Sequence, residues 1–134
     1  MGAGKSTDGF SLNSKSKLLK YMKGKSTKEA WDSLTLPKEL PNAKFVPIGN
    51  GKDFYFGQLR GSSIEGNGLM IWAAGDLYFG EFKDGTMDGH GRYCETNGDV
   101  YDGEWKNGVR EGRGTKIWSK FNERYTGEFH NNFR

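Results

Sequence analysis

The sequence predicts a mainly β fold: an elongated, single-layer ribbon of antiparallel β-hairpin repeats, preceded by a short, basic, partly helical arm. The first observation behind this prediction is a Tyr-x-Gly unit that recurs at Tyr55, Tyr78 and Tyr101, and again at Tyr125 after one inserted residue. The second is composition, because 14% of the residues are aromatic while the mean hydropathy is only −0.82. A fixed repeat period indicates a repeat architecture, and aromatic rings can build a core in a thin structure.

Charge and composition divide the chain into two parts. Residues 1–53 contain 10 lysines and 5 acidic residues, a net charge of +5, whereas residues 54–134 contain 10 basic and 12 acidic residues, a net charge of −2. We therefore predict a basic arm over residues 1–53, with short helices and a proline-containing linker, and one repeat domain over residues 54–134. No apolar run is long enough for a membrane-spanning helix. With one cysteine, Cys94, no internal disulfide can form, which favours a reducing, cytoplasmic compartment.

The arm is expected to form two short helices followed by an extended stretch. Residues 16–22 are predicted to form a short basic helix, which Gly24 terminates, and residues 26–29 have the pattern of a capping box for a second helix. Pro37, Pro41 and Pro47 are expected to keep the chain extended from the end of the second helix to Gly51. Trp31 is predicted either to anchor the arm in a partner or to plug the first edge of the ribbon. The apolar residues of the two segments are Leu18, Leu19 and Met22, and Ala30, Trp31 and Leu34.

Within each copy of the repeat, we expect two short antiparallel strands. Tyr78, Gly80 and Phe82 occur at i, i+2 and i+4, so an extended strand places them on one face. A glycine inside a strand marks a place where another group packs closely against the backbone. We expect that group to be an aromatic ring of the neighbouring copy. The predicted repeat core consists of Tyr55, Gly57, Tyr78, Gly80, Phe82, Tyr101, Gly103, Trp105, Tyr125, Gly127 and Phe129.

Glycine-containing dipeptides predict the turns between these strands. Asp84-Gly85 and Asn107-Gly108 tolerate the positive φ of tight hairpin turns, and Asn97-Gly98 is expected to play the same part between copies. Two strands per copy at a spacing of about 4.8 Å give a sheet on the order of 30 Å long. The open face of such a ribbon is a natural binding surface.

The repeated pattern closely resembles the MORN repeat (membrane occupation and recognition nexus): it reads Tyr-x-Gly-x-aromatic-x-x-Gly, then Gly-x-Gly, then Asn-Gly-Asp. The resemblance covers residues 54–134, about 3.5 repeats. The first copy departs from the pattern at Leu59 and Ser62, and the fourth has Asn132 in place of a glycine, which a left-handed position tolerates. The resemblance implies an antiparallel hairpin ribbon with a groove. It also implies assembly roles, since MORN proteins are scaffolds in cilia and flagella, in the cortical cytoskeleton of protists and at membrane junctions.

The residues between the core positions are candidates for contacts with partner proteins. Phe56 and Phe79 occupy the second position of the motif and are expected to point away from the core stripe. They form either a docking patch on the outer face or a surface that the arm covers as a cap. The fourth copy breaks off after its first strand, so we expect another protein or a second copy of the chain to complete this C-terminal edge. Phe133 is a further candidate contact.

No catalytic, cofactor-binding or metal-binding residues are predicted. His90 and His130 are the only histidines, and they are too far apart in sequence to suggest metal-ligand spacing. Cys94 is expected to be a buried or half-buried strand residue rather than a nucleophile. The acidic ladder of Glu81, Glu104 and Glu128, which Gln58 interrupts in the first copy, is predicted to be a solvated face rather than a cation site.

The first six residues allow two interpretations of a short motif. Gly4-Lys5-Ser6 looks like the end of a phosphate-binding loop, but the upstream glycine that such a loop needs is missing. The same residues match the Met-Gly-x-x-x-Ser pattern for N-myristoylation of Gly2. A single myristoyl chain anchors a protein weakly, so the lysines of the arm would have to supply a second signal towards an anionic membrane surface.

We therefore predict a non-enzymatic scaffold or adaptor for protein–protein assembly in a cytoskeletal or ciliary (axonemal) complex, located in the cytoplasm. One alternative is a peripheral membrane tether that uses Gly2 lipidation and the polybasic arm. A further alternative is a targeting subunit for an enzyme on a separate chain. Nucleic acid is not an expected partner, because basic and aromatic residues are not interleaved. A mitochondrial location is not favoured, because the arm contains no arginine.

Overall fold

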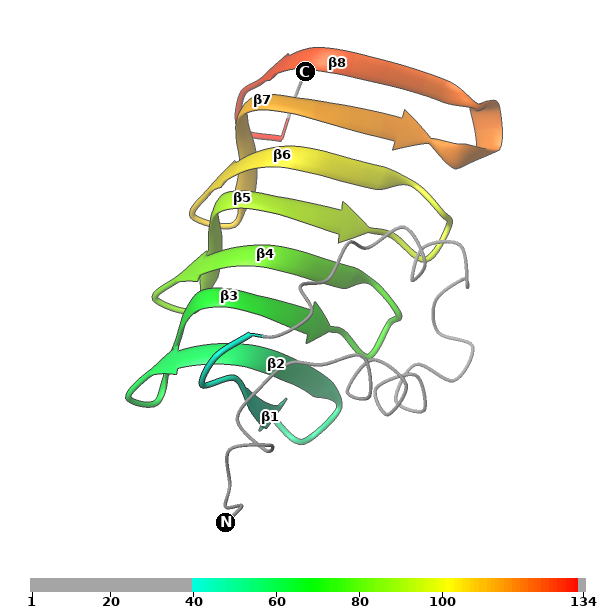
Figure 1. Ribbon diagram of the computed structural model, residues 1–134. Helices are drawn as coiled ribbons and strands as arrows, with labels where there is room; N and C mark the ends of the chain where they lie inside the picture. Colours follow the sequence, from blue (N-terminus) through cyan, green and yellow to red (C-terminus); the bar gives the residue numbers. More distant parts are fainter. Residues whose placement is uncertain (1–39, 133–134) are drawn as a thin grey trace.

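In this computed structural model, residues 40–132 are described, and they form one open antiparallel sheet of eight strands in the order β1-β2-β3-β4-β5-β6-β7-β8. Figure 1 shows the strands following one another in a single layer. The predicted mainly β hairpin ribbon is therefore confirmed. The elements are β1 (Lys44–Ile48), β2 (Asp53–Arg60), β3 (Ser63–Ile71), β4 (Leu77–Lys83), β5 (Thr86–Cys94), β6 (Val100–Lys106), β7 (Val109–Trp118), the short 3-10 helix η2 (Ser119–Phe121) and β8 (Glu123–Phe129).

The first strand, β1, precedes the repeats and was not predicted. It pairs with β2, and Pro47 lies opposite Phe54 in this pairing. A proline has no N–H to donate, so it is tolerated in a strand that has a neighbour on one side only.

The predicted arm helices, Gly2, Trp31 and Phe133 lie outside the described residues. No helix within residues 40–132 is long and apolar enough to span a membrane.

The tight hairpin turns have the predicted left-handed backbone. Asp84 and Gly85 have φ values of 50° and 83°, and the Asn107-Gly108 turn has the same values. Two positive φ angles at the centre of a turn match the twist of the flanking strands. The fourth copy places Asn132 at φ 75°, which confirms that asparagine replaces glycine there. These turns fix the register of each hairpin.

The turn between copies differs from the prediction. Gly98 has a φ of 94°, but Asn97 does not have a positive φ. The Gly98 N–H donates to the Glu95 carbonyl oxygen at 2.9 Å, and the Glu95 N–H donates to the carbonyl oxygen of Asp99 at 2.8 Å. The chain thus reverses through a wider loop in which only the glycine is left-handed, so the equivalence of Asn97-Gly98 with Asp84-Gly85 was wrong.

A continuous row of glycines crosses the sheet from β2 to β8. Each glycine lies opposite the next in the pairing of neighbouring strands, so the backbones approach without side chains on one face. A Cβ added at Gly91 would collide with the ring of Tyr78, and Tyr78 belongs to the same copy. The prediction that a ring of the neighbouring copy packs against the glycine was therefore wrong. The row is Gly57, Gly68, Gly80, Gly91, Gly103, Gly114 and Gly127.

In the first three copies the tyrosine lies over a pair of glycines, and in the fourth Tyr125 lies over Gly127 alone; each tyrosine is fixed there by a hydrogen bond. The Tyr78 hydroxyl donates to the Glu81 carbonyl oxygen at 2.9 Å, and the equivalent bonds of Tyr55, Tyr101 and Tyr125 are 2.7–2.9 Å long. Tyr78 is fully buried. The ring therefore closes the gap that the missing side chains leave, which explains why the frame needs both residue types.

Neighbouring copies are joined by edge-to-face contacts between these rings. The centroid of Tyr78 lies 5.1 Å from that of Phe82 in its own copy and 5.5 Å from that of Trp105 in the next copy. Tyr101 repeats the arrangement with Trp105 at 5.1 Å and Phe129 at 4.9 Å. Edge-to-face pairs at these distances are favourable beyond the area they bury. The stack along one face therefore couples each repeat to its neighbour in addition to the strand pairing between copies.

Burial of these phenols predicts a late tyrosine titration. Burial raises the pKa of Tyr55, Tyr78 and Tyr93 above the ordinary value of 10.0, and it raises the pKa of Tyr101 to about 12. Because unfolded phenols ionise near pH 10, the stability that these four residues contribute is complete below pH 10 and declines as the pH rises towards 12. Absorbance of tyrosinate should show Tyr55, Tyr78, Tyr93 and Tyr101 still protonated above pH 10. Ionisation of these four residues near pH 10 in the folded chain would contradict this.

Candidate functional site

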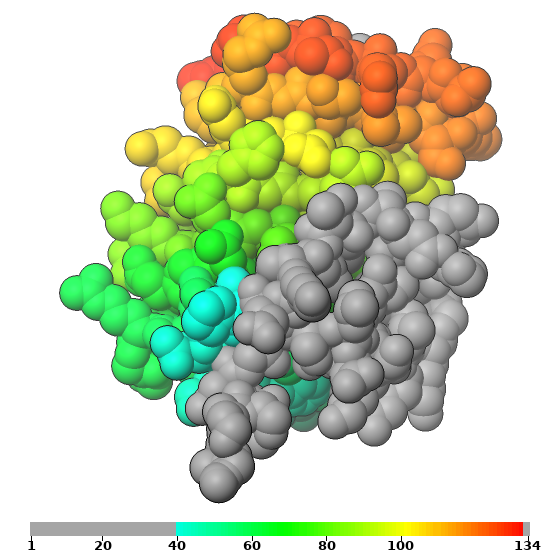
Figure 2. Space-filling model, viewed as in Figure 1, coloured from blue at the N-terminus to red at the C-terminus, as the bar shows by residue number. Residues whose placement is uncertain are grey.

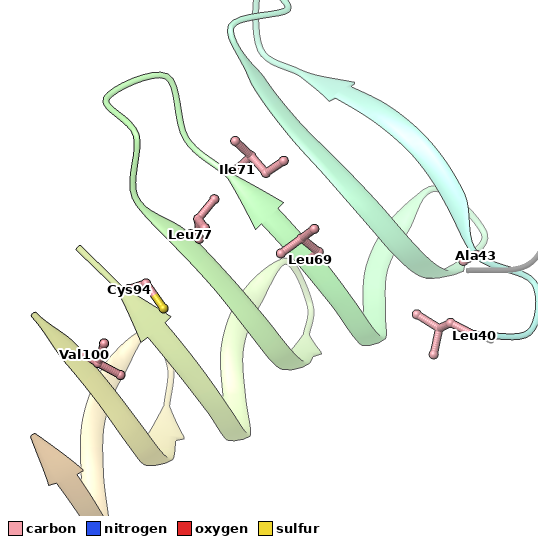
Figure 3. Packing of buried hydrophobic residues seen from close by; sticks show 7 residues of the cluster. All are labelled: Leu40, Ala43, Leu69, Ile71, Leu77, Cys94 and Val100. Atoms are coloured by element: carbon pink, nitrogen blue, oxygen red, sulfur yellow. The ribbon is translucent and has the colours of Figure 1, made fainter. Parts of the chain in front are cut away.

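The sheet has two apolar faces, which point in opposite directions. The tyrosine stack lies on one of them, called here the aromatic face. The other, called here the aliphatic face, is built from β3 to β6 together with two residues that precede β1. Figure 3 shows these side chains in a row across the strands, with Leu40 and Ala43 at one end and Val100 at the other. The row consists of Leu40, Ala43, Leu69, Ile71, Leu77, Cys94 and Val100.

Phe56 and Phe79 lie on the aliphatic face, as the alternation of strand residues predicts. Both are half-buried and pack against the aliphatic row. Cys94 is buried in the same row, which confirms the expected strand position for this residue. The pairing of the strands carries the row of Phe56 and Phe79 on to polar residues in the later copies. In order along the sheet it reads Phe56, Leu69, Phe79, Arg92, Asp102, Thr115 and Thr126.

An open groove lies where this row changes from apolar to polar. We call it the Phe79 groove; it has a volume of about 340 Å³ and crosses β4, β5 and β6 over the bare backbones of Gly80 and Gly91. An Nη1 atom of Arg92 lies 2.8 Å from Asp102 Oδ2, and His90 Nε2 lies 3.2 Å from Asp102 Oδ1. The side chains that line the groove are Asn67, Phe79, Glu81, His90, Arg92 and Asp102.

The acidic ladder contributes to the structure of this groove. Glu81 Oε2 accepts a hydrogen bond from the His90 N–H at 2.9 Å, at the point where the pairing of β4 and β5 shifts register. Glu104 accepts one from the Arg113 N–H in the same way. Gln58 uses its amide oxygen for the equivalent bond, to the Asn67 N–H at 3.0 Å. Glu81 and Glu104 are exposed, as predicted, but Gln58 does not interrupt the ladder, because bonding to a backbone N–H needs an oxygen and not a charge.

A smaller hollow on the aromatic face, about 240 Å³, is bordered by Tyr93, Tyr101 and Trp105. The Arg110 guanidinium carbon lies 5.5 Å from the Tyr101 ring centroid and 5.9 Å from that of Phe129, a cation–π geometry. Beside it, the buried Lys116 ammonium donates to Glu95 at 2.7 Å. The charged groups bordering this hollow thus already have partners within the chain.

The Phe79 groove offers an aromatic ring beside an ion-paired guanidinium, a carboxylate and an imidazole. This combination suits non-covalent recognition of a polar surface with one apolar contact. Sequence reasoning named Phe79 but missed His90, Arg92 and Asp102, because these three lie on β5 and β6 and only strand pairing brings them beside Phe79 in β4. A usable signal existed, since equivalent positions in other copies hold different residues. Among residues 40–132, no group of three or more His, Cys, Asp or Glu side chains is arranged to hold a metal ion.

The strand at the C-terminal edge, β8, pairs with β7. After β8 the chain folds back towards β7: the Asn132 N–H donates to the Arg110 carbonyl oxygen at 2.9 Å, and Asn132 Oδ1 accepts from the Arg110 N–H at 2.8 Å. This bonding joins the turn of the fourth copy to the third. Completion of the edge by another chain stays a prediction.

A comparison with protein-family models finds the MORN repeat in four consecutive segments, residues 55–77, 78–100, 101–122 and 125–134. Each segment begins at one of the four tyrosines that lie over the glycine row. The matched segments cover more than half of the sequence. No curated protein matches the chain.

Proposed function

Because the chain belongs to the MORN repeat family, we propose that it is a non-enzymatic scaffold that holds partner proteins together in a cytoskeletal or ciliary complex of the cytoplasm. Repeats of this family are non-catalytic modules that mediate protein or membrane-lipid interactions. The ciliary or cytoskeletal setting goes beyond that general role. It is supported by the assembly roles that the family resemblance implies.

One observation carries the proposal. The groove is lined by residues that vary between copies, whereas the residues of the recurring Tyr-x-Gly-x-aromatic pattern make contacts within the sheet. The Tyr78 hydroxyl bonds to the Glu81 carbonyl oxygen, the Glu81 carboxylate bonds to the His90 N–H, and the glycines leave room for the ring, so these residues explain folding. Phe79, Arg92 and Asp102 line an open surface instead. Variable polar side chains around one ring give specificity for a particular partner, because wrong partners leave charges unpaired.

A charge swap in the groove tests this proposal. Arg92→Asp combined with Asp102→Arg keeps an ion pair between β5 and β6 but reverses the pattern that a partner meets. The partners recovered by affinity purification and quantified by mass spectrometry should fall by at least about tenfold. The fold should persist, because the pair itself is preserved.

The matched control is the swap of Arg113→Glu with Glu128→Arg. This pair lies further along the same face, at 3.1 Å, with side chains 66% and 70% exposed. Exposed pairs contribute little to stability, so this variant should fold and should keep the wild-type partners. Equal recovery of partners by wild type and both swaps would mean that the groove is not the binding surface.

A second candidate function, a peripheral membrane tether, is favoured by the N-terminal sequence. Gly2 fits the N-myristoylation pattern, and the arm is rich in lysine. Co-sedimentation with anionic vesicles, measured with and without a myristoyl group, separates the two functions. Salt-sensitive binding would favour the tether, and absence of binding would favour the scaffold. An enzyme among the purified partners would favour a third role, as the targeting subunit of that enzyme.

A further inference from the structure

The aliphatic face is withdrawn from solvent to an extent that a single-layer sheet does not explain. Leu69 and Leu77 are 0% exposed, Cys94 is 1% exposed and Ile71 is 2% exposed. A sheet needs another element against a face before that face is buried. The tyrosine stack covers only the opposite face, so the cover of the aliphatic face must come from elsewhere.

The described residues supply only the beginning of this cover. Leu40 and Ala43 belong to the aliphatic cluster and are 6% and 0% exposed. The segment between them is fixed to the sheet, because Gln58 Nε2 donates to the Pro41 carbonyl oxygen at 3.2 Å. In Figure 3, however, the row continues from Leu40 past β3 and β4 to Val100 in β6. Two small contacts at one end cannot cover a row that crosses four strands.

We propose that the N-terminal segment of the same chain, residues 16–34, packs its apolar side chains onto the aliphatic face. Leu40, the first of the described residues, itself lies on this face. From β3 to β6 the row spans three strand spacings, about 15 Å, which about ten helical residues cover. The segment contains apolar residues in two groups, around Leu19 and around Trp31.

Charge complementarity points to the same occupant. Residues 1–53 carry a net charge of +5 and residues 54–134 a net charge of −2, so the two parts attract each other. The neighbouring row that runs through Phe56 and Phe79 turns polar at Arg92 in β5 and Asp102 in β6, so the apolar cover lies beside these two residues, over Cys94 and Val100. The Phe79 groove lies at this boundary and stays open beside the cover. Figure 2 views the molecule from the same side as Figure 1 and shows the later strands, β7 and β8, forming one end of the described surface.

Cys94 provides a reporter for this contact, because it is the only cysteine and lies within the covered row. In the full chain, alkylation of Cys94 by iodoacetamide should be at least about a hundredfold slower than in the same chain unfolded by denaturant. Leu19→Asp combined with Trp31→Asp should raise the native rate by at least about tenfold. The matched control, Ser16→Asp with Ser26→Asp, adds the same charge to the same two segments and should leave the rate unchanged.

Equal rates in wild type and in the Leu19→Asp, Trp31→Asp variant would overturn the proposal, as would rapid alkylation of the wild-type chain. A second measurement decides the matter if that variant fails to fold. A benzophenone amino acid in place of Trp31, activated by light in dilute full-length protein, should crosslink within one chain to the peptide that contains Leu77 and Phe79. Crosslinks between two chains would identify a second copy as the occupant, and crosslinks to Trp105 would place the segment on the aromatic face. Either result would contradict the proposal.

Discussion

Replacement of Gly80 by alanine is expected to lower the free energy of unfolding by about 3 kcal/mol. Gly80 lies opposite Gly68 on one side and Gly91 on the other, at the centre of the glycine row. A Cβ there would lie 2.5 Å from the carbonyl oxygen of His90 and 2.7 Å from the Tyr78 hydroxyl oxygen. The first contact involves backbone, which cannot move away without breaking the pairing of β4 with β5.

Gly85→Ala is the matched comparison for this substitution. A Cβ at Gly85 meets no atom within 4 Å, but its φ of +83° is unfavourable for alanine. The expected loss is about 1 kcal/mol, from backbone strain alone. Urea unfolding of both variants, followed by far-ultraviolet circular dichroism, gives the two free energies. A Gly80→Ala loss no larger than that of Gly85→Ala would show that the glycine row has room for side chains.

Replacement of Tyr78 by alanine is expected to cost about 4 kcal/mol of unfolding free energy. The ring is fully buried, contacts Phe82 and Trp105 in two successive copies, and covers the backbone of Gly91. Its removal opens a cavity at the junction of two repeats. The loss should therefore appear as a large shift of the urea midpoint.

Tyr78→Phe separates the ring from its hydroxyl group. Phenylalanine keeps both edge-to-face contacts and loses only the 2.9 Å bond to the Glu81 carbonyl oxygen. The expected loss is about 1 kcal/mol, the usual net value of such a bond. If phenylalanine were as destabilising as alanine, the hydroxyl bond rather than ring packing would hold the repeats together.

The sequence was sufficient for features that depend on local chemistry. Alternation along β4 places Tyr78 and Phe82 on one face, and the Asp84-Gly85 dipeptide needs no distant contact to adopt its turn. Local chemistry does not decide whether a glycine pair is covered by the tyrosine of its own copy or by that of the next copy. Both satisfy the spacing, and only the torsion angles of the side chain bring the Tyr78 ring over Gly91. Strand β1 escaped prediction because it lacks the repeat pattern and contains Pro47.

The candidate site was predictable only in part, for a related reason. Phe79 could be named because it lies between Tyr78 and Gly80 and therefore points to the opposite face of the strand. His90, Arg92 and Asp102 come together through the pairing of β4 with β5 and of β5 with β6, and the register shift beside Gly80 determines which of them face the groove. A sequence pattern gives the order of strands but not the size of such a shift, since the extra residues of a bulge have no signature of their own beyond glycine.

The central claim is that each of the first three repeats is held by a tyrosine ring lying over a pair of glycines in its own copy. A double-mutant cycle of Tyr78→Ala and Gly91→Ala, measured by urea unfolding, tests it most directly. A methyl group at Gly91 collides with atoms of the Tyr78 ring, so it should be costly in the wild-type chain and nearly harmless once the ring is removed. The predicted coupling between the two substitutions is about 2 kcal/mol. Additive losses, with no coupling, would contradict the account.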